Sequence, residues 1–386
     1  MIRTFHPVGQ GAFYSEEFFD ANGKVVFRVV YDCGSSKYCK LQSNVGGSPL
    51  NRSDIEKRVE NAFNKTDIID MLFVSHFDSD HVNLISRLRP FKSRHHIRRV
   101  VLPLLSAEER YMLTGAYLLS DELRGDAEQR EIIINMINSP ETYFGSCEKI
   151  VFVRPEVWND ERSKREYPHE RIAFEDLTGV IPSQSEIVIA KRNPVEKHTS
   201  DWIFSPYNHK PERYHDLKMA LEGSFNREGR AFELKMLKDV KFVDENLVAL
   251  RRCYACLHDG VNRNSMVLYS GPNVITSNVP AGALHRMGDS RRDCWMGRYL
   301  WQMMGCCMRC CTSRGGPFHP VFASRPGCLY TGDLSLRDAQ LTRRFKKFLS
   351  NIGIVQLPHH GSQDSFGELA LRHMGRGTAT GILRFQ

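Results

Sequence analysis

Residues 69–81 read IDMLFVSHFDSDH, an apolar run that ends in two histidines and two aspartates. The continuous apolar stretch 69–75 predicts a strand buried on both faces. A short loop directly after such a strand can fold back and aim several side chains into one crevice. Imidazole together with carboxylate suits zinc, manganese or iron rather than calcium, which prefers oxygen ligands alone. The candidate ligands on this loop are His76, Asp78, Asp80 and His81.

Two further polar clusters follow apolar stretches much later in the chain. The sequence TGD at 331–333 comes after the apolar stretch 327–330, and PHHGS at 358–362 comes after 352–357. Open α/β sheets gather their ligand sites at the carboxyl ends of strands, so we expect these clusters to lie near the first one. They contribute the candidate ligands Asp333, His359 and His360.

The rest of the chain alternates predicted strands and helices, which indicates a layered α/β architecture. Residues 53–64 suit a helix with Ser53 as its N-cap. The mostly helical residues 104–147 and the Cys-, Gly- and Arg-rich residues 271–327 interrupt the alternation. We therefore predict one domain, 1–386, that carries these two segments as insertions.

The composition sets broad limits on the class of protein. The 386 residues are 41% hydrophobic and 25% charged, which allows a sizeable core, and the net charge is +8. Such a charge is compatible with a polyanionic partner but does not require one. We find no secretory signal and no apolar run of about 18 residues, so we expect a cytoplasmic protein without membrane association. The odd count of 11 cysteines indicates reduced thiols or metal ligation rather than a disulfide scaffold.

Several motifs, taken in their order along the chain, resemble those of the metallo-β-lactamase fold. Within that fold the chain resembles the ComEC-like branch, the hydrolase domain of DNA-internalisation competence proteins. That branch also has an aspartate where most of the superfamily has a second histidine, and the resemblance runs from about residue 5 to residue 366. The motifs are Val8-Gly9-Gln10-Gly11, Asp32-Cys33-Gly34, His76-x-Asp78-x-Asp80-His81, Asn264-Ser265 before an apolar stretch, Thr331-Gly332-Asp333 and Pro358-His359-His360-Gly361-Ser362.

The resemblance implies an αββα sandwich that binds one or two divalent ions, most plausibly zinc or manganese. The superfamily's middle histidine, a ligand of the first ion, has no clear counterpart, and His198, His209 and His258 are candidates by position only. By position in the motifs, His76 and Asp78 would hold the first ion, Asp80, His81 and His359 the second, and Asp333 would bridge the two.

The chemistry implied by the resemblance is hydrolysis by a metal-bound hydroxide, because a metal-bound water loses a proton near neutral pH. Asp80 and Asp333 would orient the hydroxide and are the implied catalytic residues. Asp32 would support the ligands without binding the ion. His360 would either bind it or hydrogen-bond to a ligand.

A phosphodiester, in nucleic acid or elsewhere, is the expected substrate. The stretch 87–99, RLRPFKSRHHIRR, is basic and close in sequence to the predicted ligands, although a solvated helix face would explain it as well. Two alternatives remain open: hydrolysis of another ester, lactone or thioester, and a catalytically silent binding or regulatory module. The candidate substrate-binding residues are Ser362, Asn264, Arg94, Arg98 and Arg99.

Two cysteine clusters allow a separate structural zinc site, because two-residue gaps let both thiolates face one ion. The alternative is that these cysteines are free thiols. The clusters are Cys253-x-x-Cys256 and Cys306-Cys307-x-x-Cys310-Cys311.

The last part of the chain raises two further expectations. Residues 343–348, RRFKKF, suit an amphipathic helix with Phe345 and Phe348 inward, or a basic segment that contacts nucleic acid. No core strand is expected after 352–357, so the sandwich would be short at its C-terminal end. The open sheet edge would then favour a homo-oligomer or a partner protein.

Overall fold

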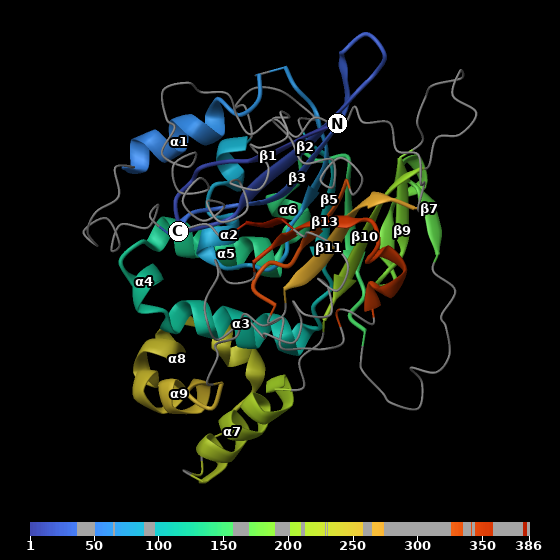
Figure 1. The fold of residues 1–386 in the computed structure, drawn as a ribbon. Helices are drawn as coiled ribbons and strands as arrows, with labels where there is room; N and C mark the ends of the chain where they lie inside the picture. Colours follow the sequence, from blue (N-terminus) through green and yellow to red (C-terminus); the bar gives the residue numbers. More distant parts are fainter. Residues whose placement is uncertain are drawn as a thin grey trace, which may run out of the picture.

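Two mixed β-sheets lie at the centre of the protein and helices flank them (Figure 1). The protein is therefore of the α/β class, as the alternation of elements predicts. The computed structural model describes residues 1–36, 51–64, 66–88, 97–156, 170–189, 201–209, 213–227, 229, 231–257, 265–273, 326–334, 341, 344–357 and 381–383.

The first sheet has the strand order β1-β2-β3-β4-β5-β6-β8. Its first three strands are antiparallel, and every pair from β3 onward is parallel. The strands are β1 (Ile2–Phe5), β2 (Phe13–Phe19), β3 (Val25–Cys33), β4 (Ile69–Phe73), β5 (Ile97–Pro103), β6 (Lys149–Val153) and β8 (Gly179–Ile181).

The second sheet has the strand order β14-β13-β12-β11-β10-β9-β7. Within the run β9-β10-β11-β12, each strand is antiparallel to the next. The pairs β12-β13, β13-β14 and β7-β9 are parallel. The strands are β7 (Arg171–Ala173), β9 (Glu186–Ile189), β10 (Trp202–Asn208), β11 (Met266–Pro272), β12 (Gly327–Tyr330), β13 (Ile352–Gln356) and β14 (Gly381–Leu383).

The helices form two groups. The segment predicted to be helical, 104–147, contains α3 to α6, and α7, α8 and α9 pack together beside α3 (Figure 1). The α-helices are α1 (Arg52–Glu60), α2 (Ser79–Val82), α3 (Ala107–Leu119), α4 (Asp121–Arg124), α5 (Ala127–Asn138), α6 (Pro140–Tyr143), α7 (Arg213–Arg227), α8 (Val240–Glu245) and α9 (Leu247–Tyr254). Short 3-10 helices span Ile85–Leu88, Phe174–Asp176, Leu234–Lys238 and Lys346–Phe348.

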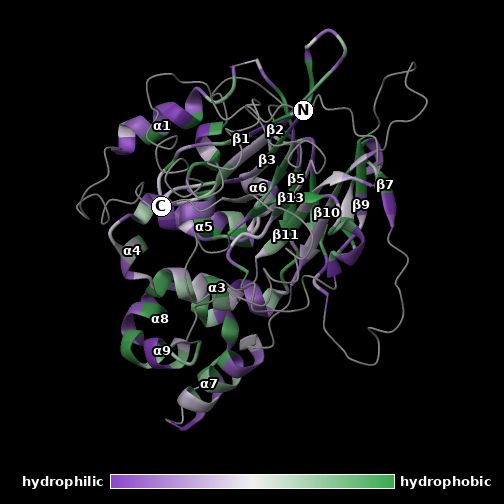
Figure 2. Ribbon diagram, viewed as in Figure 1, coloured by the Kyte–Doolittle hydropathy of each residue, from purple (hydrophilic) through white to green (hydrophobic). Residues whose placement is uncertain are grey.

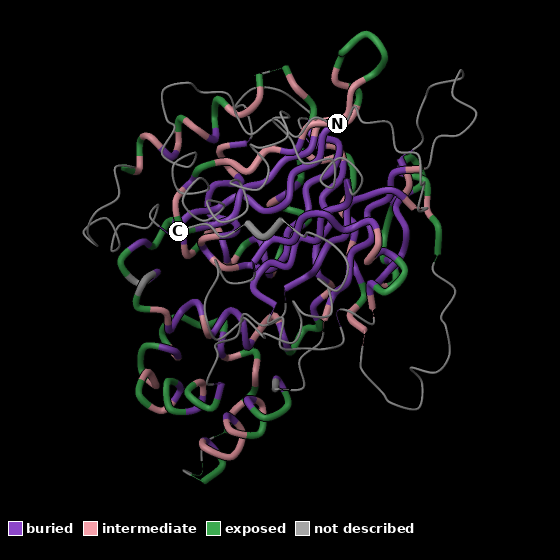
Figure 3. Tube along the Cα trace, viewed as in Figure 1, coloured by how far each residue is buried: buried purple, intermediate pink, exposed green. Residues whose placement is uncertain are grey.

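Three apolar clusters separate the successive layers. Along β4, Met71 and Phe73 lie between the two sheets, whereas Leu72 faces the helices, because successive side chains of a strand point to opposite faces. Both faces of β4 are therefore buried, as its continuous apolar sequence predicts. Figure 2 shows the hydrophobic strands and Figure 3 shows that they are buried at the centre of the protein.

The outer face of the second sheet is covered by residues that follow β12. Phe345 and Phe348 are buried there against Val267, Leu329 and Val355. The prediction that these two phenylalanines face inward is confirmed. The described layers thus run in the order helices, sheet, sheet, helical segment.

Two details of the fold differ from the sequence-based expectations. The first helix begins at Arg52, with Asn51 as the N-cap whose side chain accepts a hydrogen bond from the Asp54 N–H, so the prediction of Ser53 as N-cap was wrong by two positions. The expectation that no strand follows 352–357 was also wrong, because β14 pairs with β13 and covers that edge. In the described part of the chain, no helix combines the length and the apolar character needed to cross a membrane.

His6 gives the fold a specific sensitivity to acid. Its ring stacks on Phe13 with the centroids 3.9 Å apart, and its Nε2 lies 2.8 Å from Ser15 Oγ. Burial lowers the pKa of His6 from 6.5 to about 3, so the unfolded chain binds this proton more readily than the folded chain. The stability that neutral His6 contributes is complete above pH 6.5 and falls as the pH drops toward 3, by at most about 1.4 kcal/mol per pH unit.

Urea unfolding at pH 7 and pH 5.5 measures this effect. The free energy of unfolding of the wild type should fall over this interval by about 1 kcal/mol more than that of His6→Gln, which carries no titrating ring. The same pH dependence in both proteins would contradict the assignment to His6.

Candidate metal centre

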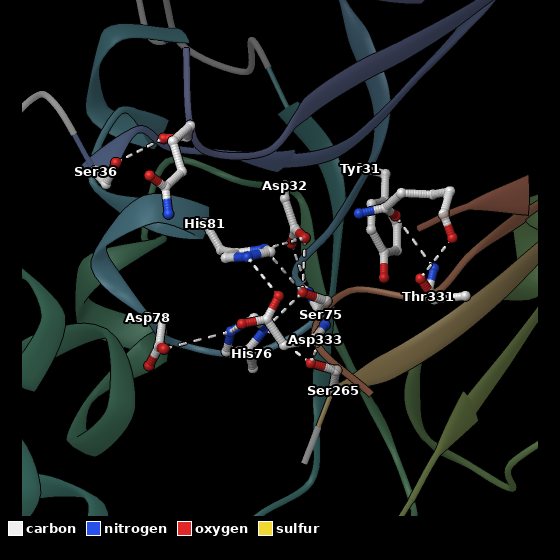
Figure 4. Close-up of polar contacts among 12 residues, drawn as sticks. Tyr31, Asp32, Ser36, Ser75, His76, Asp78, His81, Ser265, Thr331 and Asp333 are labelled. Carbon is white, nitrogen blue, oxygen red and sulfur yellow. Dashed lines mark hydrogen bonds and ion pairs between the residues drawn. The ribbon is translucent and has the colours of Figure 1, made fainter. Parts of the chain in front are cut away.

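Two of the polar clusters, the one after β4 and the one after β12, meet where β3, β4 and β12 end and β11 begins (Figure 4). Ser75 and His76 follow β4, His81 lies on α2, and Asp333 follows β12. The backbone N–H of Met266 donates to the Ser75 carbonyl at 2.8 Å, so the two sheets are joined directly at this point. Residues far apart in the sequence are thereby held in one place.

His76, His81 and Asp333 form a buried group of possible metal ligands. Each offers one ligand atom, and these atoms all lie within 4.8 Å of one another. Asp333 Oδ1 is 3.2 Å from His81 Nε2, and Asp333 Oδ2 is 3.6 Å from His76 Nε2. Donor atoms that share an ion lie roughly 3 to 3.5 Å apart, given metal–ligand bonds of about 2.0–2.2 Å. The spacing of the three side chains fits a shared cation.

Two atoms of this group are buried polar atoms of the kind that a ligand satisfies. His76 Nε2 and Asp333 Oδ1 make no hydrogen bond with any residue that the structure describes. Buried polar atoms in folded proteins almost always have a partner, because leaving one unsatisfied costs about 1–3 kcal/mol. Two nitrogen donors and a carboxylate suit zinc or manganese, so the residues present fit a divalent cation.

Asp32 holds His81 in the orientation that this group requires. Its Oδ2 accepts a hydrogen bond from His81 Nδ1 at 2.8 Å, which leaves His81 Nε2 turned toward Asp333. Both oxygens of Asp32 also accept hydrogen bonds from Ser75, Oδ1 from the backbone N–H at 2.7 Å and Oδ2 from the hydroxyl at 2.6 Å. Asp32 has a left-handed backbone, with φ of 55°, which is uncommon for a residue with a side chain. Asp32 thus holds His81, a candidate ligand, by a direct hydrogen bond.

Asp32 also acts on His76, through Ser75. The Ser75 hydroxyl lies 2.8 Å from His76 Nδ1, and because it donates its hydrogen to Asp32, its oxygen accepts from the imidazole. Ser265 Oγ lies 3.1 Å from the same nitrogen and accepts a hydrogen bond from the Asp333 N–H at 2.8 Å. This network favours a proton on His76 Nδ1 and leaves Nε2 as the atom with a lone pair.

The charges in the group depend on one another. Burial and the charge of His81 lower the pKa of His76, but Asp333 and Asp78 outweigh them and raise it to about 9. Burial likewise lowers the pKa of His81, yet Asp333 and Asp32 raise it well above its usual value. Burial raises the pKa of Asp333, and the two imidazoles bring it well below the usual range. The Asp333 carboxylate therefore stays ionised and requires positive charge beside it, from ring protons or from a cation.

Asp78 lies beside this group and is held by a residue from α3. Its Oδ2 is 3.7 Å from His76 Nε2 (Figure 4). Its Oδ1 accepts a hydrogen bond from the Tyr117 hydroxyl at 2.7 Å. Burial, followed by the charge of Asp78, raises the pKa of Tyr117 well above its usual value. Tyr117 therefore remains a hydrogen-bond donor.

Asp80, predicted as a ligand and a catalytic residue, does not belong to the three-residue group among the described residues. It is half-buried on α2, and its charge contributes to the raised pKa of His81. Its backbone carbonyl accepts a hydrogen bond from Ala12 at 3.0 Å, which fixes the start of α2 against the strand that follows residue 12. Asp80 thus lies next to the group rather than within it.

The segment after β3 interlocks with the segment after α2. The Leu84 N–H donates to the Cys33 carbonyl at 3.0 Å, and the Ser35 N–H donates to Asn83 Oδ1 at 3.0 Å. Asn83 Nδ2 returns a hydrogen bond to the Ser35 carbonyl at 2.9 Å. These contacts fix the helix that carries His81 relative to the strand that carries Asp32.

Gly34 is expected to be needed for stability, because the segment after β3 passes close to the backbone of α2 at this residue. A Cβ atom there would lie 2.5 Å from the His81 backbone nitrogen and 2.6 Å from the Asp80 carbonyl oxygen, so one backbone would have to move. Gly34→Ala should therefore lower the free energy of unfolding by about 2 kcal/mol, as overpacked interiors do. Gly223→Ala, on α7 with its nearest atom 3.8 Å away, is the matched control and should be neutral or stabilising. Equal stability of the two variants in urea would contradict the close approach.

The structure does not bring Arg98 and Arg99 to the group. Both lie at the start of β5, whereas the group lies where the neighbouring parallel strand β4 ends. Arg98 pairs with Asp70 at 3.1 Å and with Glu148 at 3.3 Å, and the buried Arg99 pairs with Glu148 at 2.7 Å. Their charges are therefore engaged in ion pairs at the opposite end of the sheet.

Three predicted residues lie in the described part of the chain but do not belong to the group. Of the first cysteine cluster, Cys253 is buried on α9 and Cys256 is exposed. His209 follows β10, and its Nδ1 lies 3.3 Å from the Tyr207 hydroxyl. The predicted residues outside the described ranges are Arg94, His198, His258, Asn264, Cys306, Cys307, Cys310, Cys311, His359, His360 and Ser362.

Comparisons of the chain with protein-family models, with curated proteins and with solved structures found no match.

Proposed function

We propose that this chain is a metal-dependent hydrolase of the metallo-β-lactamase fold, in its ComEC-like branch. One observation carries the proposal: His76, His81 and Asp333, from three separate segments, converge in a buried group with the spacing of metal ligands. The order of layers, with helices outside two facing sheets, supports the fold assignment. The order of the sequence motifs along the chain supports the family assignment.

His76, His81 and Asp333 would hold one cation, and Asp78 lies close enough to His76 to join them. A divalent ion bound there would lower the pKa of water and offset the negative charge that develops on a phosphoryl group. Asp32 keeps both imidazoles in the orientation for binding, directly for His81 and through Ser75 for His76. The rings are thus preorganised before any ion arrives.

The carboxylates of the site would act on the attacking water. Asp333 stays ionised because its pKa is well below the usual range, so its oxygens can accept a hydrogen bond from water and orient it. Asp80, next to His81, is the second carboxylate to which we assign this orienting role. Neither step requires a residue outside the described part of the chain.

A phosphodiester, including one in nucleic acid, is the substrate class that we propose. Support comes from the net charge of +8 and from the resemblance to a DNA-handling branch. The paired Arg98 and Arg99 give no support, because they lie at the other end of the sheet.

A substrate panel tests this choice. The purified chain would be stripped with a chelator, reloaded with zinc or manganese, and assayed on bis(4-nitrophenyl) phosphate and on single- and double-stranded DNA. A 4-nitrophenyl ester, a lactone and a thioester would be assayed in parallel. We expect metal-dependent turnover of the phosphodiesters. Turnover of the ester, lactone or thioester alone would contradict a phosphodiester substrate and identify that compound class instead. Metal binding without any turnover would indicate a binding module.

A further inference from the structure

A residue outside all the predicted motifs reaches the candidate metal centre. Tyr117, in the last turn of α3, donates a hydrogen bond from its hydroxyl to Asp78 Oδ1 at 2.7 Å, across 39 positions of sequence. Tyr117 is only 6% exposed, so water does not compete strongly for this bond. A helix of the 104–147 segment is therefore in direct contact with a candidate ligand.

The two oxygens of Asp78 have different roles in this arrangement. Oδ1 accepts from Tyr117, while Oδ2 lies 3.7 Å from His76 Nε2 (Figure 4). A carboxylate bound through one oxygen cannot rotate freely about its Cβ–Cγ bond, so the direction of its second oxygen is fixed as well. The hydroxyl of Tyr117 thus determines where Oδ2 points.

Tyr117 is itself held by the helices rather than by the sheet. The hydroxyl of Tyr254, at the end of α9, donates to the Met112 carbonyl of α3 at 2.6 Å. Asn138 Nδ2, at the end of α5, donates to Thr114 Oγ1 at 2.8 Å. Two other helices therefore fix α3 within two turns of Tyr117 on its N-terminal side, which is the rigid support that a precisely placed side chain requires.

We propose that Tyr117 is a positioning residue that aims Asp78 Oδ2 at the cation held by His76. This inference rests on the proposed function, because it requires a metal at the group. It makes the helical segment a part of the metal centre, since a shift of α3 would move a ligand oxygen. Partners that orient metal ligands in this way commonly change metal affinity by about 10- to 100-fold when they are removed.

Titration of zinc or cobalt into the metal-free protein, in competition with a chromophoric chelator, tests the proposal. Tyr117→Phe removes only the hydroxyl and should weaken the tightest site by about 10-fold or more. Tyr269→Phe is the matched control, because it removes a buried hydroxyl bond to the Pro272 carbonyl at 2.9 Å that involves neither α3 nor Asp78. Its affinity should equal that of the wild type. The visible spectrum of bound cobalt should change in Tyr117→Phe and not in the control.

A double-mutant cycle separates positioning from a general loss of stability. Asp78→Asn should weaken binding further than Tyr117→Phe, and the double variant should be no weaker than Asp78→Asn, because the hydroxyl acts only through that carboxylate. Thermal unfolding of the metal-free proteins should place Tyr117→Phe close to Tyr269→Phe. An affinity of Tyr117→Phe equal to that of the wild type would overturn the inference while the proposed function stands. A wild type that binds no metal would overturn both.

Discussion

Replacement of Asp333 by asparagine is expected to lower metal-dependent phosphodiester hydrolysis by about 1000-fold, the upper range for the loss of one preorganised charged group. Asp333 faces both imidazoles, with its oxygens 3.2 Å from His81 Nε2 and 3.6 Å from His76 Nε2. An amide has the same shape but no charge, so it can neither bind the cation strongly nor balance the positive charge of the group. Initial rates on bis(4-nitrophenyl) phosphate at saturating zinc or manganese measure the effect.

Asp176→Asn is the matched control for this substitution. Asp176 is exposed in the 3-10 helix Phe174–Asp176, so the same chemical change there should leave the rate unaltered. Circular dichroism would establish that both variants are folded. A folded Asp333→Asn protein with the rate of the wild type would exclude Asp333 from the catalytic group.

Replacement of Arg3 by methionine is expected to lower the free energy of unfolding by about 3–5 kcal/mol, because it leaves a buried carboxylate without its cation. Arg3 and Glu16 are 3% and 2% exposed, and Arg3 Nε donates to Glu16 Oε1 at 2.7 Å. Glu16 also accepts hydrogen bonds from two hydroxyls of the second sheet, Tyr330 at 2.8 Å and Ser270 at 2.6 Å. The ion pair lies within the first sheet, and the two hydroxyl bonds to Glu16 join it to the second. Urea unfolding of the metal-free protein measures the contribution of Arg3.

An exposed ion pair supplies the control for Arg3. Arg171 pairs with Asp201 at the surface, and Arg171→Met should cost less than about 1 kcal/mol. The double variant Arg3→Met with Glu16→Leu should recover part of the lost stability, because it removes both charges together. A loss of less than about 1 kcal/mol in Arg3→Met would show that the interior tolerates the unpaired Glu16 carboxylate.

The candidate metal-binding group was predictable in part because its signals are local. An apolar strand that runs directly into His76 or Asp333 places that side chain at the carboxyl end of a strand, where α/β folds gather their ligand sites. The sequence therefore indicates both the residue types and their approximate place. It does not indicate which carboxylates enter the group, and Asp80 lies beside it although the motif contains it.

Apart from Asp32, the residues that support the group were not predictable from sequence patterns. Ser75 immediately precedes His76, yet nothing in the sequence distinguishes a serine that links two side chains from one that ends a strand. Tyr117 reads as an ordinary core residue of a helix, and only the packing of α3 brings its hydroxyl to Asp78. The prediction that Arg98 binds substrate failed because a basic stretch of sequence does not show which acidic residues will pair with it in the fold. Arg98 pairs with Asp70.

The central claim is that the buried group of His76, His81 and Asp333 binds a metal. Elemental analysis of the purified protein tests it most directly, with wild type beside His76→Ala and beside His215→Ala, an exposed histidine of α7. We predict near-stoichiometric zinc, manganese or iron in the wild type and in His215→Ala, and loss of that metal in folded His76→Ala. Absence of metal from the wild type, with none bound when zinc or manganese is added back, would contradict the claim.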